Sequence, residues 1–170
     1  MTKSRAGLTE LEGAVLGVIR RAPRMTPYAL RRVFQTSQSA EWSGSAGAVY
    51  PAVARLMRAG LLLERRSDDR RGSKTYALSA KGLRALEQWS MDVERALGPG
   101  LDPFRVRAAV WREFAPAKRR ALTETLLSRL AMLDSALSED EPGMDEGDKV
   151  MRDLHRALLA SRRDWLKAQR

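Results

Sequence analysis

Apolar residues recur at helical spacing in the first sixty positions of the chain. Thr9 and Glu12 can satisfy each other's backbone amides, which predicts a helix that begins at Thr9. Thr26-Pro27 predicts a second helix start, because threonine caps helices and proline suits their first turn. A Ser- and Gly-rich loop at 37–44 precedes a third helix, expected from Ser45 to Ala59. The expected buried positions are Leu11, Val15, Val18 and Ile19, then Leu30, Val33 and Phe34, then Val49, Val53, Leu56 and Met57.

A short hairpin and a fourth helix are expected next. Residues 61–66 and 73–78 have the pattern of two strands, and residues 67–72 between them have the composition of a turn. This turn contains Arg70 and Arg71, so the hairpin is basic. Ser79 is expected to cap the fourth helix, which ends near Gly98 and carries Leu83, Leu86, Trp89 and Val93.

The remainder of the chain has only helical patterns. One helix is marked by Val106, Val110, Trp111 and Phe114, and a second by Leu122, Leu126, Leu130, Leu133 and Leu137. An acidic loop at 138–148 leads to a last helix with Val150, Leu154, Leu158 and Trp165 on one side. The Gly98-Pro99-Gly100 segment predicts a boundary between a domain of residues 1–97 and a domain of residues 98–170.

Three helices followed by a hairpin and another helix is the order of a winged helix-turn-helix. We therefore expect a mainly α fold with a small β-hairpin, extended by a helical C-terminal domain. In such a fold the third helix can enter the major groove of DNA, and the hairpin, or wing, can touch the flanking backbone. Tyr50, Arg55 and Arg58 are expected on the open side of that helix. Ala46, Gly47 and Ala48 at its start are small enough to let the backbone approach DNA.

The charge supports this assignment. Residues 20–84 hold 14 Lys and Arg against 4 Asp and Glu, which accounts for the whole net charge of +10 of the 170-residue chain. A basic excess in one segment is expected where a surface neutralises phosphates, although a generally basic, soluble surface is the alternative.

Other classes of function find little support. Without cysteine there is no disulfide, thiolate zinc site or cysteine nucleophile, and His155 is the only histidine. We expect no enzyme, no metal and no cofactor. Apolar runs such as Leu61–Leu63 are far too short to span a membrane, and the amino terminus does not follow the plan of a signal peptide, so a cytoplasmic protein is expected.

Several segments resemble one family of bacterial regulators, the PadR family. They are LTELEGAVLGVI, SAGAVYPAVARLMRAGLL, RRSDDRRGSKTYALSAKG and the tail after Pro103. Within the family the chain looks like the members with a virulence-activator-type helical C-terminal domain. The most specific matches are Tyr50-Pro51 with Leu56 and Gly60-Leu61, and the segment from Lys74 to Gly82.

The resemblance implies a homodimeric repressor of transcription that binds a palindromic operator in double-stranded DNA. It implies DNA contacts from Ser45, Tyr50 and neighbouring residues, and phosphate contacts from Arg70, Arg71 and Lys74. The usual His-Gly-Tyr of the second helix is Thr26-Pro27-Tyr28 here, and the usual Ser-Pro-Gly-Thr of the third is Ser45-Ala46-Gly47-Ala48. Tyr28 is kept and a hydroxyl is missing at Ala48, so sequence preference does not transfer.

Four points have alternatives. The leucines at 122–137, with Leu154, Leu158 and Trp165, form either a helical hairpin within one chain or a dimer interface, and both can hold at once. Trp89 is either core or the contact of a small aromatic effector, as in some relatives. Pro51 either bends the third helix or lies harmlessly in its first turn. The alternative function is a winged-helix module that binds an acidic protein and has no specific DNA target.

Overall fold

The described part of the chain is mainly helical, with one antiparallel pair of strands. The computed structural model describes residues 7–22, 24–37, 46–66, 73–98, 102–137 and 145–169. Its elements are α1 Glu10–Arg21, α2 Pro27–Gln35, the 3-10 turn η1 Ala46–Ala48, α4 Val49–Arg58, β1 Leu62–Arg66, β2 Lys74–Leu78, α5 Ala80–Ser90, α6 Val93–Leu97, α7 Asp102–Trp111, α8 Pro116–Ala136 and α9 Glu146–Lys167. This is the expected winged helix-turn-helix with a helical C-terminal part.

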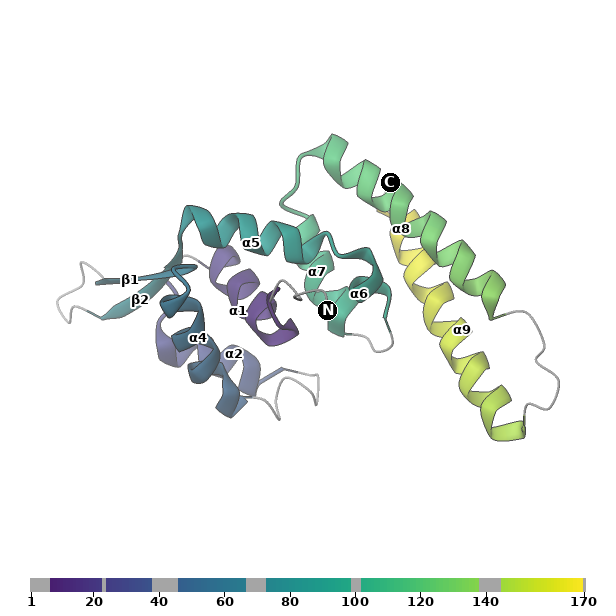
Figure 1. Cartoon of the computed structure of the whole chain (residues 1–170), viewed down its shortest axis with the longest axis horizontal. Coiled ribbons are helices and arrows are strands. Elements are labelled where there is room, and N and C mark those ends of the chain that lie inside the picture. Colours follow the sequence, from purple (N-terminus) through teal and green to yellow (C-terminus); the bar gives the residue numbers. More distant parts are fainter. Residues whose placement is uncertain are drawn as a thin grey trace, which may run out of the picture.

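Helix α1 lies at the centre of the winged-helix part, with α2, α4, α5 and α7 around it (Figure 1). The predicted capping box is confirmed, because the Glu12 amide donates to Thr9 Oγ1 and the Thr9 amide donates to Glu12 Oε2. The buried stripe of α1, which includes Leu16, meets fully buried side chains from its neighbours, among them Leu30, Val49 and Leu56. The core of this part therefore holds α4 in place from behind.

The wing follows α4 and is tied back to the helices at its base. Leu62 pairs with Leu78 and Arg66 with Lys74 in the antiparallel register. The Tyr76 amide donates to the Met25 carbonyl, which joins β2 to the turn between α1 and α2. This segment passes through Arg24, whose φ of 67° lies in the left-handed region.

The carboxyl end of α4 is bonded to the start of α5. Gly60 adopts a φ of 70° there, which glycine tolerates best. The Ser79 hydroxyl donates to the Gly60 carbonyl at 2.7 Å, and Lys81 Nζ donates to the Ala59 carbonyl at 2.8 Å. Ser79 also accepts from the Gly82 amide, so the predicted cap of α5 is confirmed.

The expected single helix from Ser79 to about Gly98 is wrong, because the structure divides it. Helix α5 ends at Ser90, and Asp92 then caps the separate helix α6 by accepting from the Arg95 amide at 3.1 Å. A short acidic side chain that bonds to nearby backbone competes with helix continuation. The expected burial of Val33 on α2 is also wrong, since it is 42% exposed.

Two hydrophobic clusters meet at α7. Val110 packs with α1 and α5, whereas Phe104 and Trp111 pack with α6, α8 and α9. The predicted boundary between residues 97 and 98 stays a prediction, because α7 contributes to both sides.

Helices α8 and α9 form an antiparallel hairpin beside the winged-helix part (Figure 1). The side of α9 that packs on α8 carries Leu159 and Leu166, and Arg162 from the same side donates to the Leu97 and Gly98 carbonyls at the end of α6. The expected apolar side of α9 is therefore not its buried one, since Val150 and Leu154 are 58% and 67% exposed. Of the described residues, no helix is long and apolar enough to cross a membrane.

Candidate nucleic-acid interface

Aromatic and basic side chains from α2 and α4 lie together on the surface. Tyr28 on α2 is 72% exposed, and Tyr50 on α4 is 42% exposed. The Arg31 guanidinium of α2 lies 6.0 Å from the centre of the Tyr50 ring, which joins the two helices at their outer faces. Thr26 caps α2, its hydroxyl accepting from the Ala29 amide at 3.2 Å. We call the surface of Tyr28, Arg31 and Tyr50 the aromatic–basic patch.

The amino end of α4 is open. Gly47 and Ala48 are exposed, and a Cβ built on Gly47 would meet nothing within 4 Å. Ala48 stands at the N-cap of α4, follows directly from the turn η1, and has no side chain that could cap the helix. Ala46 is buried at 8% exposure and faces the core instead. The expected cap, Ser45, lies outside the described residues.

Pro51 is the third residue of α4. Backbone N–H groups of the first turn of a helix have no carbonyl partner within that helix, so a proline there removes no hydrogen bond of the helix. The geometry favours the interpretation in which Pro51 lies in the first turn without bending the helix.

Arg55 is engaged within the chain. Its Nε donates to Glu12 Oε1 at 2.8 Å, and the Glu12 side chain is only 12% exposed. Burial alone would raise the pKa of Glu12, but hydrogen bonds from Arg55 and Thr9 and the charge of Arg55 lower that pKa below its usual value. Arg55 thus connects α4 to the first turn of α1, and sequence alone did not predict this partner.

The wing carries exposed cations on both strands. Lys74 on β2 is exposed and lies 3.1 Å from Glu64 on β1. Arg65 and Arg66 on β1 are exposed as well. Arg70 and Arg71, the predicted phosphate contacts of the turn, lie outside the described residues.

A basic hollow lies at the base of the wing. It has a volume of about 420 Å³. Its lining includes four arginines, Arg20, Arg24, Arg65 and Arg66, and no acidic side chain of the described residues. Arg20 also forms an ion pair with Glu113 at 3.1 Å. The charge excess of residues 20–84 predicts a basic surface, but the sequence does not show that these four arginines line one hollow.

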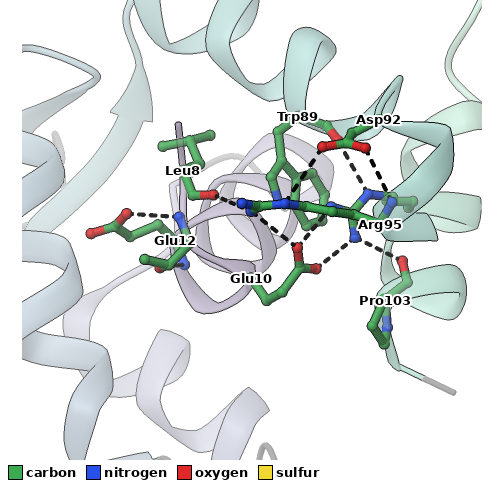
Figure 2. Close-up of polar contacts among 9 residues, drawn as sticks. Leu8, Glu10, Glu12, Trp89, Asp92, Arg95 and Pro103 are labelled. Carbon is green, nitrogen blue, oxygen red and sulfur yellow. Dashed lines mark hydrogen bonds and ion pairs between the residues drawn. The ribbon is translucent and has the colours of Figure 1, made fainter. Parts of the chain in front are cut away.

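Trp89 lies in a polar network between α1 and α7. The guanidinium of Arg107 stacks 4.0 Å from the centre of the Trp89 ring and donates to the Trp89 carbonyl. Its other nitrogens bond to Glu10 Oε2 at 2.5 Å, Glu10 Oε1 at 2.8 Å and the Pro103 carbonyl. Figure 2 shows Glu10, Trp89, Arg95 and Pro103 gathered around this contact. Arg95 donates to the Leu8 carbonyl and lies 3.8 Å from Glu10, which adds a second cation.

A cavity of about 480 Å³ opens beside this network. Its lining includes Leu8, Leu61, Trp89 and Arg95. The Trp89 ring is 5% exposed, and its Nε1–H is buried without a hydrogen-bond acceptor among the described residues. Because Trp89 and the cation Arg95 both line the cavity, Trp89 stays a candidate effector contact.

No metal centre is formed by the part of the chain that the structure describes. Within it, no group of three His, Cys, Asp or Glu side chains could hold a metal ion. His155 lies half-buried on α9.

Known proteins are similar to this chain in sequence and in structure. The sequence model of the transcriptional regulator PadR-like family matches residues 15–88. Among solved structures, the chain is similar to a PadR-like transcriptional regulator from Bacillus cereus, with 16% identity over 98% of this chain and 97% of that chain and a TM-score of 0.45. It is similar to Bacillus subtilis PadR in complex with operator DNA, with 18% identity, coverage of 94% and 97%, and a TM-score of 0.45. It is also similar to Bacillus subtilis PadR in complex with p-coumaric acid, with 19% identity over 94% of this chain and 92% of that chain and a TM-score of 0.44. No curated protein matches the chain.

Proposed function

Residues 15–88 of this chain are a domain of the transcriptional regulator PadR-like family, and from this we propose that the protein is a sequence-specific repressor that binds a palindromic operator as a homodimer. The observation that carries the proposal is the open amino end of α4 beside the aromatic–basic patch. This place presents the Tyr50 hydroxyl of α4 and the Arg31 guanidinium of α2, beside a helix whose inner face is buried in the core.

The amino end of α4 enters the major groove in this proposal. Gly47 and Ala48 allow close approach of the backbone, with Ser45 at the same end, and Tyr50 reaches a base edge or a phosphate. Thr26 and Tyr28 contact the adjoining backbone from the start of α2. Ala46 is left out because it faces the core. Arg55 is left out because it is paired with Glu12.

The wing supplies phosphate contacts that carry no sequence information. Lys74, Arg70 and Arg71 were expected in this role, and the basic hollow adds Arg24, Arg65 and Arg66 at the same end of the molecule. In this proposal one DNA duplex contacts both the positively charged wing and the amino end of α4.

The homodimer is supported by the surface of α9. Val150, Met151 and Leu154 are each more than half exposed, and Trp165 is 38% exposed. An apolar stripe of this length on one helix is typical of an interface. Leu122, Leu126 and Leu130 are buried within the chain and hold α8 in its own hairpin, with Leu133 and Leu137 partly buried beside them. Of the residues expected at the dimer interface, we therefore keep Leu154, Leu158 and Trp165 of α9 and leave out the leucines of α8.

An effector is part of the proposal. One similar protein is recorded with p-coumaric acid, and the lining of the cavity includes Trp89 and the cation Arg95. A small planar aromatic acid that binds there is proposed to release the operator. The test is quenching of tryptophan emission on titration with planar aromatic acids, which should be lost in Trp89→Phe and kept in Trp165→Phe.

Titration with duplex DNA tests the central proposal. Duplexes selected from the source genome should bind at least a hundredfold more tightly than a random duplex at the same salt concentration. Tyr50→Ala and Arg31→Ala should each weaken binding about tenfold. Arg120→Ala on the exposed face of α8 is the control and should not change it. Equal affinity for selected and random duplexes would reject the proposal and favour a protein-binding module.

A further inference from the structure

The basic hollow at the base of the wing is separate from the aromatic–basic patch. Its lining includes residues of α1, the turn between α1 and α2, β1, β2 and α5, and no described residue of α2 or α4. Its volume of about 420 Å³ lies in the range of sites that hold small ligands. A concave surface of this size can enclose a small molecule as well as border a DNA duplex.

The charge of the hollow has one sign. Arg24, Arg65 and Arg66 line it and are exposed, and none of them has a carboxylate partner among the described residues. A cleft lined by one sign of charge concentrates counter-ions. A guanidinium can donate two parallel hydrogen bonds to one phosphate group, which is why arginine is so common in phosphate sites. The hollow therefore suits a ligand that carries phosphate.

Arg24 has a strained backbone. Its φ of 67° lies in the left-handed region, which residues with a Cβ rarely adopt. The hydrogen bond from the Tyr76 amide to the Met25 carbonyl fixes the next residue against β2. Residues in rare backbone conformations cluster at binding sites. The strain at Arg24 thus points to a site here independently of the charge.

One wall of the hollow is apolar. Leu83 on α5 is 43% exposed, and Leu78 at the end of β2 is partly buried and lines the same hollow. Apolar surface that faces water next to arginines is favourably covered by the apolar part of a ligand. The hollow therefore combines a phosphate-binding side with an apolar side.

We propose that the basic hollow binds a small phosphorylated ligand, with its phosphate groups on Arg24, Arg65 and Arg66 and its apolar or planar part on Leu83. Nucleotides have this division. Binding of the ligand requires no DNA. Its effect on DNA rests on the proposed function, which gives the same arginines to the phosphates of the duplex. A ligand in the hollow neutralises these arginines and weakens binding to every sequence alike, because phosphate contacts do not depend on the bases.

Arg20 connects the hollow to the segment that follows α7. It lines the hollow, and its Nε lies 3.1 Å from Glu113 Oε2. Both side chains are partly exposed, at 51% and 29%, so the guanidinium can turn from one anion to another. The Glu113 carboxylate therefore competes with a bound phosphate for Arg20.

Isothermal titration calorimetry of the full chain, without DNA and at constant ionic strength, tests the site. Adenosine diphosphate should bind about tenfold more tightly than inorganic pyrophosphate, which has no apolar part. It should also bind about tenfold more tightly than citrate, a polyanion without phosphate. Adenosine alone should bind more weakly than any of these anions. Equal affinity for adenosine diphosphate, pyrophosphate and citrate would indicate general attraction of anions and overturn the proposal.

Single substitutions locate the site. Arg24→Gly is the sharpest, because glycine tolerates the left-handed φ and the variant should stay folded by circular dichroism. It should weaken binding of adenosine diphosphate about tenfold, and Arg66→Ala on the exposed strand should do the same. Arg32→Ala on α2 removes the same charge outside the hollow and should leave the affinity unchanged. Wild-type affinity in both hollow variants, or an equal loss in Arg32→Ala, overturns the site.

Glu113→Gln tests the role of Arg20. The variant removes the competing carboxylate, so adenosine diphosphate should bind about threefold more tightly than to the wild type. Unchanged or weaker binding would contradict the competition between Glu113 and the ligand.

A titration with DNA separates this inference from the proposed function. Adenosine diphosphate, at a concentration that saturates the wild type, should weaken binding of a selected and a random duplex by the same factor. The effect should be smaller in Arg24→Gly. If the chain binds the ligand but no duplex, the proposed function fails and the site stands. If it binds the selected duplex but not the ligand, the site fails and the proposed function stands.

Discussion

Glu10 and Arg107 form a two-point ion pair between residues 97 positions apart, with nitrogen–oxygen distances of 2.5 and 2.8 Å. The Arg107 side chain is fully buried and also stacks on Trp89. This pair fastens the first turn of α1 to α7. The neighbouring pair of Glu12 and Arg55 fastens the same turn to α4. One helical turn thus connects the C-terminal helices to the proposed DNA-reading helix.

Loss of the Glu10 charge should destabilise the fold. Glu10→Gln leaves the buried guanidinium of Arg107 without its anion, and removal of one partner of a buried pair is costly. Because Glu10 is one-third exposed, we expect a loss of about 2 kcal/mol in the free energy of unfolding. Urea denaturation measures it. Glu124→Gln on the exposed face of α8 is the matched control, and an equal small effect in both variants would contradict the role given to the pair.

Gly13 should not tolerate a side chain. A Cβ at Gly13 would overlap the six-membered ring of Trp89, so Gly13→Ala must displace the indole from α1. The helix preference for alanine, about 1 kcal/mol, should be outweighed by a net loss of about 2 kcal/mol. Thermal unfolding and the tryptophan emission spectrum report both effects. Gly17→Ala, whose Cβ would only touch Val110 at 3.4 Å, is the control, and the prediction fails if the two substitutions behave alike.

The contribution of Glu12 should depend on pH. Its pKa in the folded chain lies below the ordinary 4.5, so the folded state favours the carboxylate. This stabilisation is present above pH 4.5 and is lost as the pH falls through the lower folded-state pKa. Glu12→Gln keeps the helix cap and removes the charge, so it should be less stable than the wild type by roughly 1 kcal/mol at neutral pH.

Denaturation curves at several pH values test this dependence. The difference between wild type and Glu12→Gln should shrink steadily below pH 4.5. A difference that stays constant down to pH 3 or so would mean that the Glu12 charge contributes nothing.

The wing should account for part of the salt dependence of DNA binding. Lys74→Ala removes one proposed phosphate contact, so the slope of log affinity against log salt concentration should fall by about 1. The double variant Arg70→Ala with Arg71→Ala should lower it by about 2. Lys167→Ala at the end of α9 should leave the slope unchanged. If the wing variants also keep the wild-type slope, the wing has no place in the interface.

Local signals in the sequence predicted the helix starts well. Thr9, Thr26 and Ser79 each bond to an amide three residues ahead, so their effect needs no distant partner. The break at Asp92 was missed because the apolar spacing from Leu86 to Val93 continues across it. Only the cap bond of Asp92 reveals that a new helix begins.

The sequence predicted less well which of two possible surfaces or residues a side chain would contact. Helix α9 has two apolar stripes at helical spacing, and only packing against α8 decides which is buried. Arg55 was expected to face DNA, and its pairing with Glu12, 43 positions away, could not be inferred from the neighbouring residues. The sequence therefore predicted the features of the candidate site that depend on a single helix. The features that depend on contacts between helices, such as the partner of Arg55, came only from the structure.

The bonds from Ser79 and Lys81 to the carbonyls of Gly60 and Ala59, which directly follow α4, tie that helix to the start of α5, so the two should move together. A duplex that requires α4 at a different tilt would have to rotate α5, and Trp89 with it, out of its contact with Gly13 and Arg107. Operators of slightly different shape would then differ in binding free energy by the cost of displacing the Trp89 indole from these contacts.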